Sequence, residues 1–337
     1  MGLLRLFIIE DLKDHSLWFI ANGHTEPAPV LLKKMEDLIA AKMANFKSQS
    51  LAETYPLAIH PDSTSDEYAQ ALHKLMDYLI AGDVYVTNFT GTLTVDCQCP
   101  PYTFFSRLRR DNPSPFGAYL QYDSYQIISA SMERLLRING KKIETRPIKG
   151  TRRRGKTAEE DAALRKELAE SQKDQSELLM IVDLERNDLN KICEPGSVIV
   201  PDLFAVEEYA TVFHLIANVI GTLKPNQTAI DALSALFPGG SITGAPKRRA
   251  MEIIDELESS RRQLYTGTIG YLSLDGNCDL NIVIRTAVHQ GDSYYIGVGG
   301  GITAESERGF EYEEIWQKAK ALLSALKGET FDYEPYL

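Results

Sequence analysis

Long apolar runs are missing from this sequence of 337 residues. No stretch reaches the length of about 20 apolar residues that a membrane-spanning helix needs, so we expect no membrane partner. The apolar start of the chain, Met1 to Glu10, is too short and too soon interrupted to be a secretory signal. These absences predict a cytoplasmic protein.

Cysteine is scarce as well, with four residues in the whole chain. Cys97 and Cys99 form one close pair, but no second pair or histidine cluster follows them in the sequence. Zinc sites are built from such clusters, so we expect no zinc site. So few cysteines fit a reducing compartment.

An excess of positive charge is also absent, since 47 acidic and 36 basic residues give a net charge of −11. This balance opposes binding to nucleic acid, and we expect no nucleic-acid partner. Two basic clusters, residues 152–154 and 247–249, lie beside turns rich in glycine and proline. Each cluster is either a solvated face or part of a pocket for a small anion.

Repeats, low-complexity segments and breaks in composition are lacking too. Predicted strands occur in runs joined by short turns, without regular alternation with helices. This pattern predicts an α+β fold, in which antiparallel β-sheets pack as a sandwich with helices on the outside.

Two segments have the spacing of a helix N-terminal capping box, Thr64 to Glu67 and Thr157 to Glu160. Apolar residues follow the first of them with a helical period, so both segments are expected to open helices. Further helices are predicted at about 173–189, 229–237, 247–258 and 310–326, and strands at 84–89, 117–122, 125–129, 135–138, 198–200, 212–220, 269–274, 281–288 and 294–298.

Lys149 lies in the run Pro147-Ile148-Lys149-Gly150-Thr151. Proline and glycine on either side restrict the backbone, so the amine can be aimed. A dehydrated amine that is aimed in this way can act as a nucleophile or a base. The alternative is a solvated lysine in a basic turn, and the segment by itself leaves both open.

Two glycine-rich segments are candidates for ligand binding. The run Gly297 to Gly301 follows a predicted strand but does not match the dinucleotide pattern, so its bare N–H groups either hold a carboxylate or phosphate or form a tight turn. The run Phe237 to Lys247 lacks the lysine and hydroxyl residue of a phosphate loop. Its glycine, serine and threonine content still suits a small polar ligand.

The last predicted helix places Glu311, Glu314 and Lys318 on one face. The helix dipole is one explanation for carboxylates near the start of this helix. The other is that Glu314 holds a divalent cation, with Glu177 as the second carboxylate. Mg²⁺ needs only one or two protein carboxylates, because water and ligand oxygens complete its coordination.

Two further residues stand in apolar surroundings. His214 lies in a predicted apolar strand, where it is either a core residue or a catalyst. Arg285 is a cation in a strand that is expected to be buried, and such a charge needs a partner. The carboxylate of a ligand would supply a bidentate partner.

Taken together, these segments resemble the family of chorismate-using enzymes, which includes anthranilate, isochorismate, salicylate and aminodeoxychorismate synthases. The resemblance covers roughly residues 65–326 and rests on motifs in a fixed order. The motifs are Gly82-Asp83-Val84-Tyr85, Ser129 to Arg134, the Lys149 segment, Glu177 to Leu189, Gly244 to Lys247 with Arg249 to Glu252, Tyr265-Thr266-Gly267, Ile284-Arg285-Thr286, and Gly299 to Ile302 followed by Glu311 to Glu314.

The resemblance implies a chorismate-binding catalytic domain at residues 65–327, a short N-terminal segment of residues 1–64 integrated into the fold, and a C-terminal tail of residues 328–337. In its lysine at position 149, the sequence resembles the aminodeoxychorismate synthase branch. Anthranilate and isochorismate synthases carry a small residue there. This branch converts chorismate and ammonia to 4-amino-4-deoxychorismate for folate synthesis. The alternatives are an anthranilate synthase with an unusual lysine, or a non-catalytic homologue that binds chorismate or an amidotransferase.

The resemblance also implies residue roles. Lys149 would form a covalent adduct, Glu133 would be the general acid, and Mg²⁺ would bind Glu177 and Glu314. Ammonia would come from a glutamine amidotransferase subunit in a heterodimer. The remaining positions implied are His214 in the catalytic set and Arg285, Tyr265, Gly150, Thr151, Ser241, Gly300, Gly301 and Lys318 in the substrate pocket.

Two positions depart from the family pattern, since Met132 stands where proline is usual and Val86 where glutamine is usual. The region before Ser65 is also short. We therefore expect no tryptophan-binding regulatory site.

Overall fold

The computed structural model describes residues 4–44, 50–306 and 308–333. The chain divides into two compact units, Met1–Ser50 and Leu51–Leu337. The sequence places its first boundary later, after residue 64, and the domain boundaries stay a prediction. No helix in the described ranges is long and apolar enough to cross a bilayer.

The first unit contains a hairpin and a helix. Strands β1 (Leu6–Asp11) and β2 (Ser16–Ala21) pair antiparallel, and α1 (Ala28–Ala44) follows them. Leu31 and Met35 are the buried residues of this helix.

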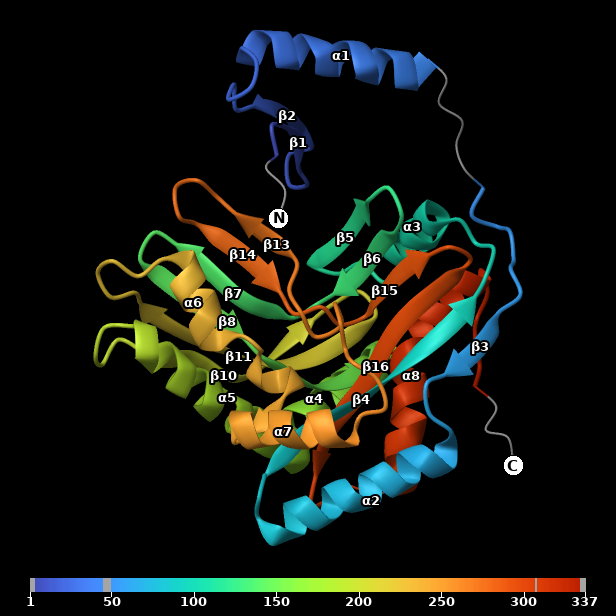
Figure 1. Cartoon of the computed structure of the whole chain (residues 1–337), viewed down its shortest axis with the longest axis vertical. Helices are drawn as coiled ribbons and strands as arrows, with labels where there is room; N and C mark the ends of the chain where they lie inside the picture. The colour runs from blue at the N-terminus through green and yellow to red at the C-terminus, as the bar shows by residue number, and fades with distance from the viewer. Residues whose placement is uncertain (1–3, 45–49, 307, 334–337) are drawn as a thin grey trace. The chain divides into compact units, whose positions relative to one another are not determined.

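The second unit contains two antiparallel sheets, each of seven strands within the described residues (Figure 1). This confirms the predicted fold class. The first sheet has the order β10-β11-β8-β7-β14-β13, with β9 also paired to β11, and the second has the order β12-β4-β16-β15-β6-β5, with β3 also paired to β4. The strands of the first sheet are β7 (Arg134–Asn139), β8 (Lys142–Arg146), β9 (Ile148–Arg153), β10 (Ile199–Glu208), β11 (Val212–Thr222), β13 (Gly270–Leu272) and β14 (Cys278–Asn281), and those of the second are β3 (Ala58–Pro61), β4 (Val86–Asp96), β5 (Phe116–Gln121), β6 (Gln126–Ser131), β12 (Gly244–Ala245), β15 (Thr286–Gln290) and β16 (Ser293–Thr303).

Helices cover the outer faces of these sheets, as Figure 1 shows for α8 beside β16 and α5 beside β11. Thr64 and Glu67 form the predicted capping box, and the Thr157 side chain accepts a hydrogen bond from the Glu160 N–H. The helices are α2 (Ser65–Ala81), α3 (Pro101–Asp111), α4 (Ala158–Glu170), α5 (Gln172–Ile192), α6 (Ala229–Leu236), α7 (Lys247–Leu257) and α8 (Arg308–Lys327), with a 3₁₀ turn at Gly240–Ile242.

One predicted strand needs correction, and one helix was not predicted. The strand expected at 281–288 is two strands in different sheets, because β14 ends at Asn281 and β15 begins at Thr286. The chain changes sheets between them, where Arg285 has a φ of +49°. Helix α3 is absent from the predicted elements. Its first residue, Pro101, resembles a loop signal, but proline is well tolerated in the first turn of a helix.

Each sheet has its own apolar core beneath its helices. Leu75 and Leu322 pack with strand residues such as Val95 in one core, and Leu178 packs with Phe213 in the other. The two long strands β4 and β16 pair over their whole length, from Val86↔Thr303 to Asp96↔Ser293. This pairing gives the second sheet a rigid centre.

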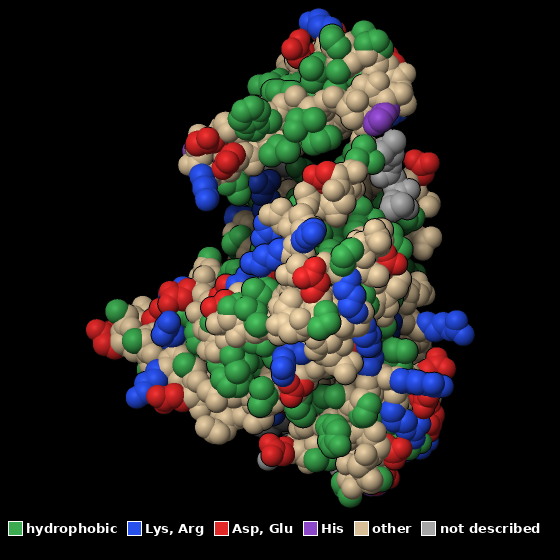
Figure 2. Space-filling model, turned by 90° about the vertical axis from the view of Figure 1, so that its left-hand side faces the viewer, with side chains coloured by type: hydrophobic (Ala, Val, Ile, Leu, Met, Phe, Trp, Pro, Cys, Tyr) green, Lys and Arg blue, Asp and Glu red, His purple; other side chains and the backbone are tan. Residues whose placement is uncertain are grey.

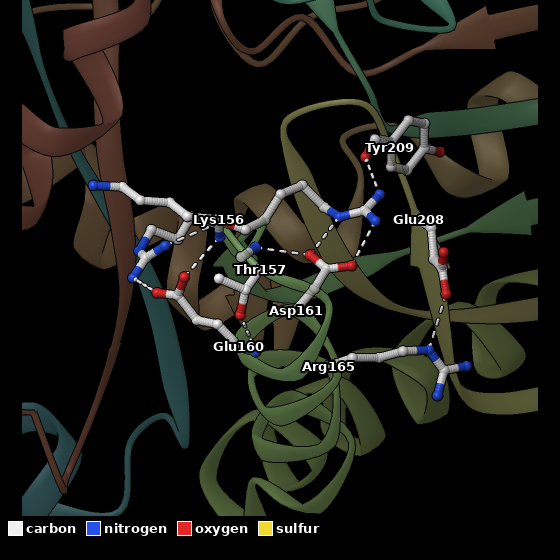
Figure 3. Close-up of polar contacts among 10 residues, drawn as sticks. Lys156, Thr157, Glu160, Asp161, Arg165, Glu208 and Tyr209 are labelled. Atoms are coloured by element: carbon white, nitrogen blue, oxygen red, sulfur yellow. Dashed lines mark hydrogen bonds and ion pairs between the residues drawn. The ribbon is translucent and has the colours of Figure 1, made fainter.

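Carboxylates neutralise the basic cluster at 152–154. Arg154 donates to both carboxylate oxygens of Asp161, at 2.8 and 2.6 Å, and this pair connects the end of β9 to α4. Figure 3 shows Asp161 with the hydrogen bonds that its carboxylate accepts. Arg152 pairs with Glu167 at 2.6 Å and with Asp174 at 3.2 Å. The cluster therefore fastens helices α4 and α5 to β9 instead of lining an anion pocket.

The second basic cluster is paired in the same way. Lys247 binds Asp188, and Arg249 binds Asp83 at 2.9 Å. Figure 2 shows Lys and Arg side chains lying among Asp and Glu side chains over the face of the second unit that it draws.

Helix α2 offers a matched test of the core. Leu75→Ala is expected to lower the free energy of unfolding by about 2–5 kcal/mol, because this fully buried side chain leaves a cavity. Ile80→Ala on the same helix should change it by less than about 0.5 kcal/mol, since Ile80 is 77% exposed. Urea unfolding measures both, and equal losses would contradict this account of the core.

Candidate active site

A bulge in β9 sets the direction of Lys149. Leu215 pairs with Lys149 and His214 with Thr151, so Gly150 is an extra residue between two pairs. Its φ is +68°, and an added Cβ would lie 2.8 Å from both Asp174 Cγ and Leu168 Cδ1. Glycine is therefore required here, and the bulge re-aims the side chains around it.

The Lys149 amine lies among groups from three other elements. Its Nζ donates to the Ser241 carbonyl oxygen at 3.4 Å. A Cβ added at Gly301 on β16 would lie 3.3 Å from this Nζ and 3.9 Å from Glu177 Oε2 on α5. The half-buried lysine is thus directed toward other predicted site residues.

Side chains of α8 lie against the next glycine of β16. A Cβ at Gly300 would lie 3.0 Å from Lys318 Nζ, 3.5 Å from Glu314 Oε1 and 3.7 Å from Glu311 Oε2. Lys318 Nζ binds Glu314 Oε1 at 2.5 Å and donates to the Gly299 carbonyl oxygen at 2.9 Å. The missing Cβ at Gly300 permits this approach of helix to strand.

Burial and neighbouring charges give these carboxyl groups different pKa values. Burial raises the pKa of Glu177 and of Glu311. Burial acts in the same direction on Glu314, but the Lys318 ammonium outweighs it and the pKa of Glu314 is lowered. Burial also lowers the pKa of Lys318, despite the Glu314 charge.

Some of these carboxylates are candidate ligands for a metal ion. The described ranges hold no group of three or more His, Cys, Asp and Glu side chains placed to bind a metal ion. Glu311 Oε2 is nevertheless buried and finds no hydrogen-bond partner within the described part of the chain, while Glu177 and Glu314 lie near the adjacent glycines. Two carboxylates and an unpartnered oxygen are a donor set that suits a hard cation such as Mg²⁺.

Glu133 is a buried acid near the lysine. Its side chain is 4% exposed, and Oε1 accepts a hydrogen bond from the Ile148 N–H at 3.3 Å. Burial raises the pKa of Glu133, although the Lys149 charge and the nearby Ser241 hydroxyl act against this. A carboxyl group that keeps its proton in this way can donate it.

The neutral form of His214 is favoured in this site. Its Nδ1 lies 3.0 Å from Thr151 Oγ1, and burial together with the Arg285 charge lowers its pKa to about 4. A neutral imidazole can donate or accept a hydrogen bond but cannot attract a carboxylate by charge.

Arg285 and Tyr265 complete the group. Arg285 donates to the backbone oxygen of Lys318, and burial lowers its pKa. The Tyr265 ring packs against Gly297, where an added Cβ would lie 2.1 Å from Tyr265 Cγ, and burial raises the pKa of Tyr265 to about 12. Contacts or charge effects thus connect all the predicted site residues, and their roles stay predictions.

One buried acid of this region is absent from the predicted site residues. Glu185 on α5 is 2% exposed and accepts a hydrogen bond from the Gly240 N–H at 2.9 Å. It follows the buried residues Leu178 and Val182 by seven and three positions, so it lies on their face of the helix. A glutamate on the apolar face of a predicted helix is unusual, and this pattern in the sequence could have identified Glu185.

Comparison with known proteins finds a matching family model and several similar relatives. The model of a family described as chorismate binding enzyme matches residues 1–324. The chain is 41% identical to "Aminodeoxychorismate synthase component 1" of Bacillus subtilis (strain 168), over 95% of the chain and 68% of the relative. It is 43% identical to the protein of that name in Klebsiella aerogenes, over 85% of the chain and 64% of the relative.

Relatives with another name are about equally similar. The chain is 41% identical to "Anthranilate synthase component 1" of Aquifex aeolicus (strain VF5), over 78% of the chain and 53% of that protein. The crystal structure of anthranilate synthase component I from Streptococcus pneumoniae TIGR4 is 33% identical, with a TM-score of 0.84 over 94% of this chain and 72% of that one. This chain thus spans about two thirds or less of the length of these curated relatives.

The low pKa of His214 predicts a pH-dependent stability. The unfolded chain binds a proton to this histidine below its ordinary pKa of 6.5, whereas the folded chain does so only near 4. Between pH 6.5 and 4, acid should therefore destabilise the wild type more than His214→Asn, by about 3 kcal/mol at the lower limit, at about 1.4 kcal/mol per pKa unit. Urea unfolding across this range measures the difference, and the exposed control His73→Asn should follow the wild type.

Proposed function

The chain belongs to the family of chorismate binding enzymes, and from this membership we propose that it replaces the C4 hydroxyl group of chorismate with an amino group. The product would be 4-amino-4-deoxychorismate, the precursor of p-aminobenzoate in folate synthesis. One observation carries the proposal: the Lys149 amine is half-buried and directed toward Gly301 and Glu177. The similarity to two relatives named aminodeoxychorismate synthase component 1 supports it.

The proposed reaction proceeds in two allylic displacements. The lone pair of the Lys149 amine adds to ring carbon C2, the two double bonds shift, and the C4–O bond breaks. Glu133 gives its proton to the departing hydroxyl group, which leaves as water. Ammonia then adds to C4, the double bonds shift back, and the Lys149 amine leaves C2, while Glu133 regains a proton from the new ammonium group. A covalent intermediate divides one difficult displacement into two easier ones.

The cationic and polar residues would orient the substrate. Arg285 and Tyr265 would hold the enolpyruvyl carboxylate, because a half-buried guanidinium can bind a carboxylate through two hydrogen bonds. The backbone of Gly301 would assist. The other pocket positions would be Gly150, Thr151, His214, Ser241, Gly300 and Lys318.

Glu177 and Glu314 would hold Mg²⁺ in this proposal. The ion would neutralise the ring carboxylate of chorismate and would help to fix the ring in the site. The unpartnered oxygen of Glu311, on the same helix as Glu314, supports a cation in this region.

Ammonia would come from a separate glutamine amidotransferase subunit in a heterodimer. All four cysteines of the chain are free and buried, and burial raises their pKa values. Glutamine hydrolysis by cysteine requires a reactive thiolate, which these cysteines are poorly suited to supply.

A second candidate is anthranilate synthesis, which is favoured by the similarity to relatives and a solved structure with that name. Anthranilate carries its amino group next to the ring carboxylate, and its formation releases pyruvate. The two reactions therefore differ in the ring carbon that is aminated and in the fate of the enolpyruvyl group.

The product decides between them. With chorismate, Mg²⁺ and an ammonium salt, we expect a 4-amino product that retains enolpyruvate, detected by liquid chromatography and mass spectrometry. Lys149→Ala should lower the rate more than about a thousandfold, since the nucleophile is lost, and Glu133→Gln should lower it about 10²–10⁴-fold. Lys156→Ala is the matched control, because Lys156 is exposed and should leave the rate unchanged.

Fluorescent anthranilate with release of pyruvate would contradict the first candidate and favour the second. Withholding ammonia offers a direct view of the intermediate, because a chorismate-derived mass increment on Lys149 is then expected by intact-protein mass spectrometry. An active enzyme without any such increment would rule out the covalent role of Lys149.

The metal proposal has its own test. Glu177→Gln and Glu314→Gln should each weaken Mg²⁺ binding about ten- to a hundredfold or more, because each removes a charged ligand. Isothermal titration of Mg²⁺ in the presence of chorismate measures this. Glu170→Gln, an exposed carboxylate at the end of α4, is the control that should bind Mg²⁺ like the wild type. Unchanged affinity for Mg²⁺ in both site variants would refute the assignment of Glu177 and Glu314 as its ligands.

A further inference from the structure

The side chain of Arg262 connects three parts of the fold. Arg262 lies in the loop between α7 and β13, and its side chain is 13% exposed. Its Nη1 donates to the Ile242 carbonyl oxygen at 2.6 Å, and its Nη2 donates to the Asn88 carbonyl oxygen on β4 at 2.5 Å. Its Nε and Nη2 also donate to the carboxylate of Glu258, directly after α7, at 2.9 and 2.6 Å. Each nitrogen of the guanidinium therefore has a partner.

The Glu258 carboxylate holds the guanidinium in one orientation. Glu258 is 5% exposed, so the pair it forms with Arg262 is largely buried. Its Oε1 also accepts hydrogen bonds from the Thr90 N–H at 2.8 Å and from the Thr90 hydroxyl at 2.9 Å. A carboxylate anchored to β4 in this way fixes the planar guanidinium, which then reaches both carbonyl oxygens at once.

The first of these carbonyl groups belongs to the 3₁₀ turn Gly240–Ile242, which carries Ser241. The Ser241 carbonyl oxygen accepts a hydrogen bond from Lys149 Nζ at 3.4 Å. Arg262 binds the next carbonyl group of the same turn, so its side chain limits how far the Ser241 carbonyl can move. The contact therefore affects the direction of the Lys149 amine.

The second carbonyl group belongs to the strand beside the glycine that Lys149 approaches. Asn88 pairs with Gly301, and its N–H donates to the Thr243 carbonyl oxygen, directly after the turn, at 2.7 Å. A Cβ added at Gly301 would lie 3.3 Å from Lys149 Nζ. Arg262 thus binds both the turn that accepts the hydrogen bond of the amine and the strand that pairs with the glycine next to it.

The main chain of Arg262 makes a separate contact with the site. Its carbonyl oxygen accepts a hydrogen bond from the N–H of Tyr265 at 2.9 Å. This bond does not involve the guanidinium, so a substitution of the side chain can leave it in place. Effects on the Ser241 turn and on Tyr265 can therefore be separated.

We propose that Arg262 is a positioning residue for the reaction on chorismate. Its guanidinium fixes the Ser241 turn against β4, and the turn then presents its carbonyl oxygen to the Lys149 amine. The proposal rests on the proposed function only in taking Lys149 as the nucleophile.

Arg262→Lys tests this role without any catalytic assay. The variant keeps a positive charge beside Glu258, but a single nitrogen cannot also reach both carbonyl oxygens. The loosened turn should free the Lys149 amine from its hydrogen bond. Acetylation of Lys149 by a limiting amount of acetic anhydride should then become about threefold faster or more, relative to that of the exposed Lys156. Peptide mass spectrometry measures this labelling ratio.

The kinetics of chorismate consumption give a second readout. Arg262→Lys should lower kcat about tenfold or more, because the amine is no longer held in the productive direction. The KM should stay within about threefold of the wild type, since the main-chain bond to Tyr265 is kept. A rise in KM larger than the fall in kcat would assign Arg262 to substrate binding and overturn the proposal.

Two control variants separate positioning from a loss of stability. Arg261→Lys makes the same change at the neighbouring, exposed position and should match the wild type in both measurements. Leu75→Ala removes a core side chain of α2 and should also match it, at a temperature where circular dichroism shows every variant to be folded. An effect in either control equal to that of Arg262→Lys would overturn the proposal.

Thr243→Val loosens the same turn while the Arg262 side chain is intact. Thr243 Oγ1 donates to the Gly239 carbonyl oxygen at 2.8 Å, and valine has a similar shape but no donor. The labelling ratio should rise in this variant too, so the proposal can be tested even if Arg262→Lys folds poorly. An unchanged ratio in folded Arg262→Lys, or in Thr243→Val, would refute it.

Failure of this proposal is distinct from failure of the proposed function. A raised labelling ratio in Arg262→Lys, together with a wild-type product other than 4-amino-4-deoxychorismate, would support the positioning and contradict the amination. Formation of 4-amino-4-deoxychorismate by the wild type, with an unchanged ratio in Arg262→Lys, would contradict the positioning alone.

Discussion

The approach of side chains to the bare glycines of β16 is the contact on which the site depends. Lys149 from β9 reaches Gly301, while Lys318 and Glu314 from α8 reach Gly300. These residues belong to different sheets and helices. An added Cβ would lie 3.0 Å from Lys318 Nζ at Gly300 and 3.3 Å from Lys149 Nζ at Gly301, so the two ammonium groups would have to shift. Gly300 and Gly301 are not among the glycines with positive φ. Their role is therefore to allow the close approach of other side chains, and not to form a turn.

Bringing so many charged groups together costs electrostatic free energy. The effect on the pKa differs from one carboxyl group to the next. Glu314 is stabilised in its charged form by Lys318, whereas burial raises the pKa values of Glu133, Glu177 and Glu185. A site of this kind contains both carboxylates suited to a cation and acids that retain protons. Sites of acid–base catalysis characteristically give groups of the same type different pKa values.

Much of the fold follows from local patterns in the sequence. The caps at Thr64 and Thr157 and the antiparallel character of the sheets are confirmed, because capping and strand alternation depend on neighbouring residues. The break between β14 and β15 was missed, because the apolar residues around Ile282 to Ile284 continue the strand pattern while the chain changes sheets. Helix α3 was missed because the proline at its start also fits a loop.

For the site, the sequence by itself determined which residue types are present and in what order, and the family motifs follow from that order. Only the tertiary structure decided that Lys149 meets Gly301, that Arg285 meets Lys318, and that Glu185 lies beneath the turn of Ser241. Such contacts join residues far apart in the chain, so no local pattern contains them. Ionisation is decided in the same way, because burial and neighbouring charge arise only when the sheets and helices have packed.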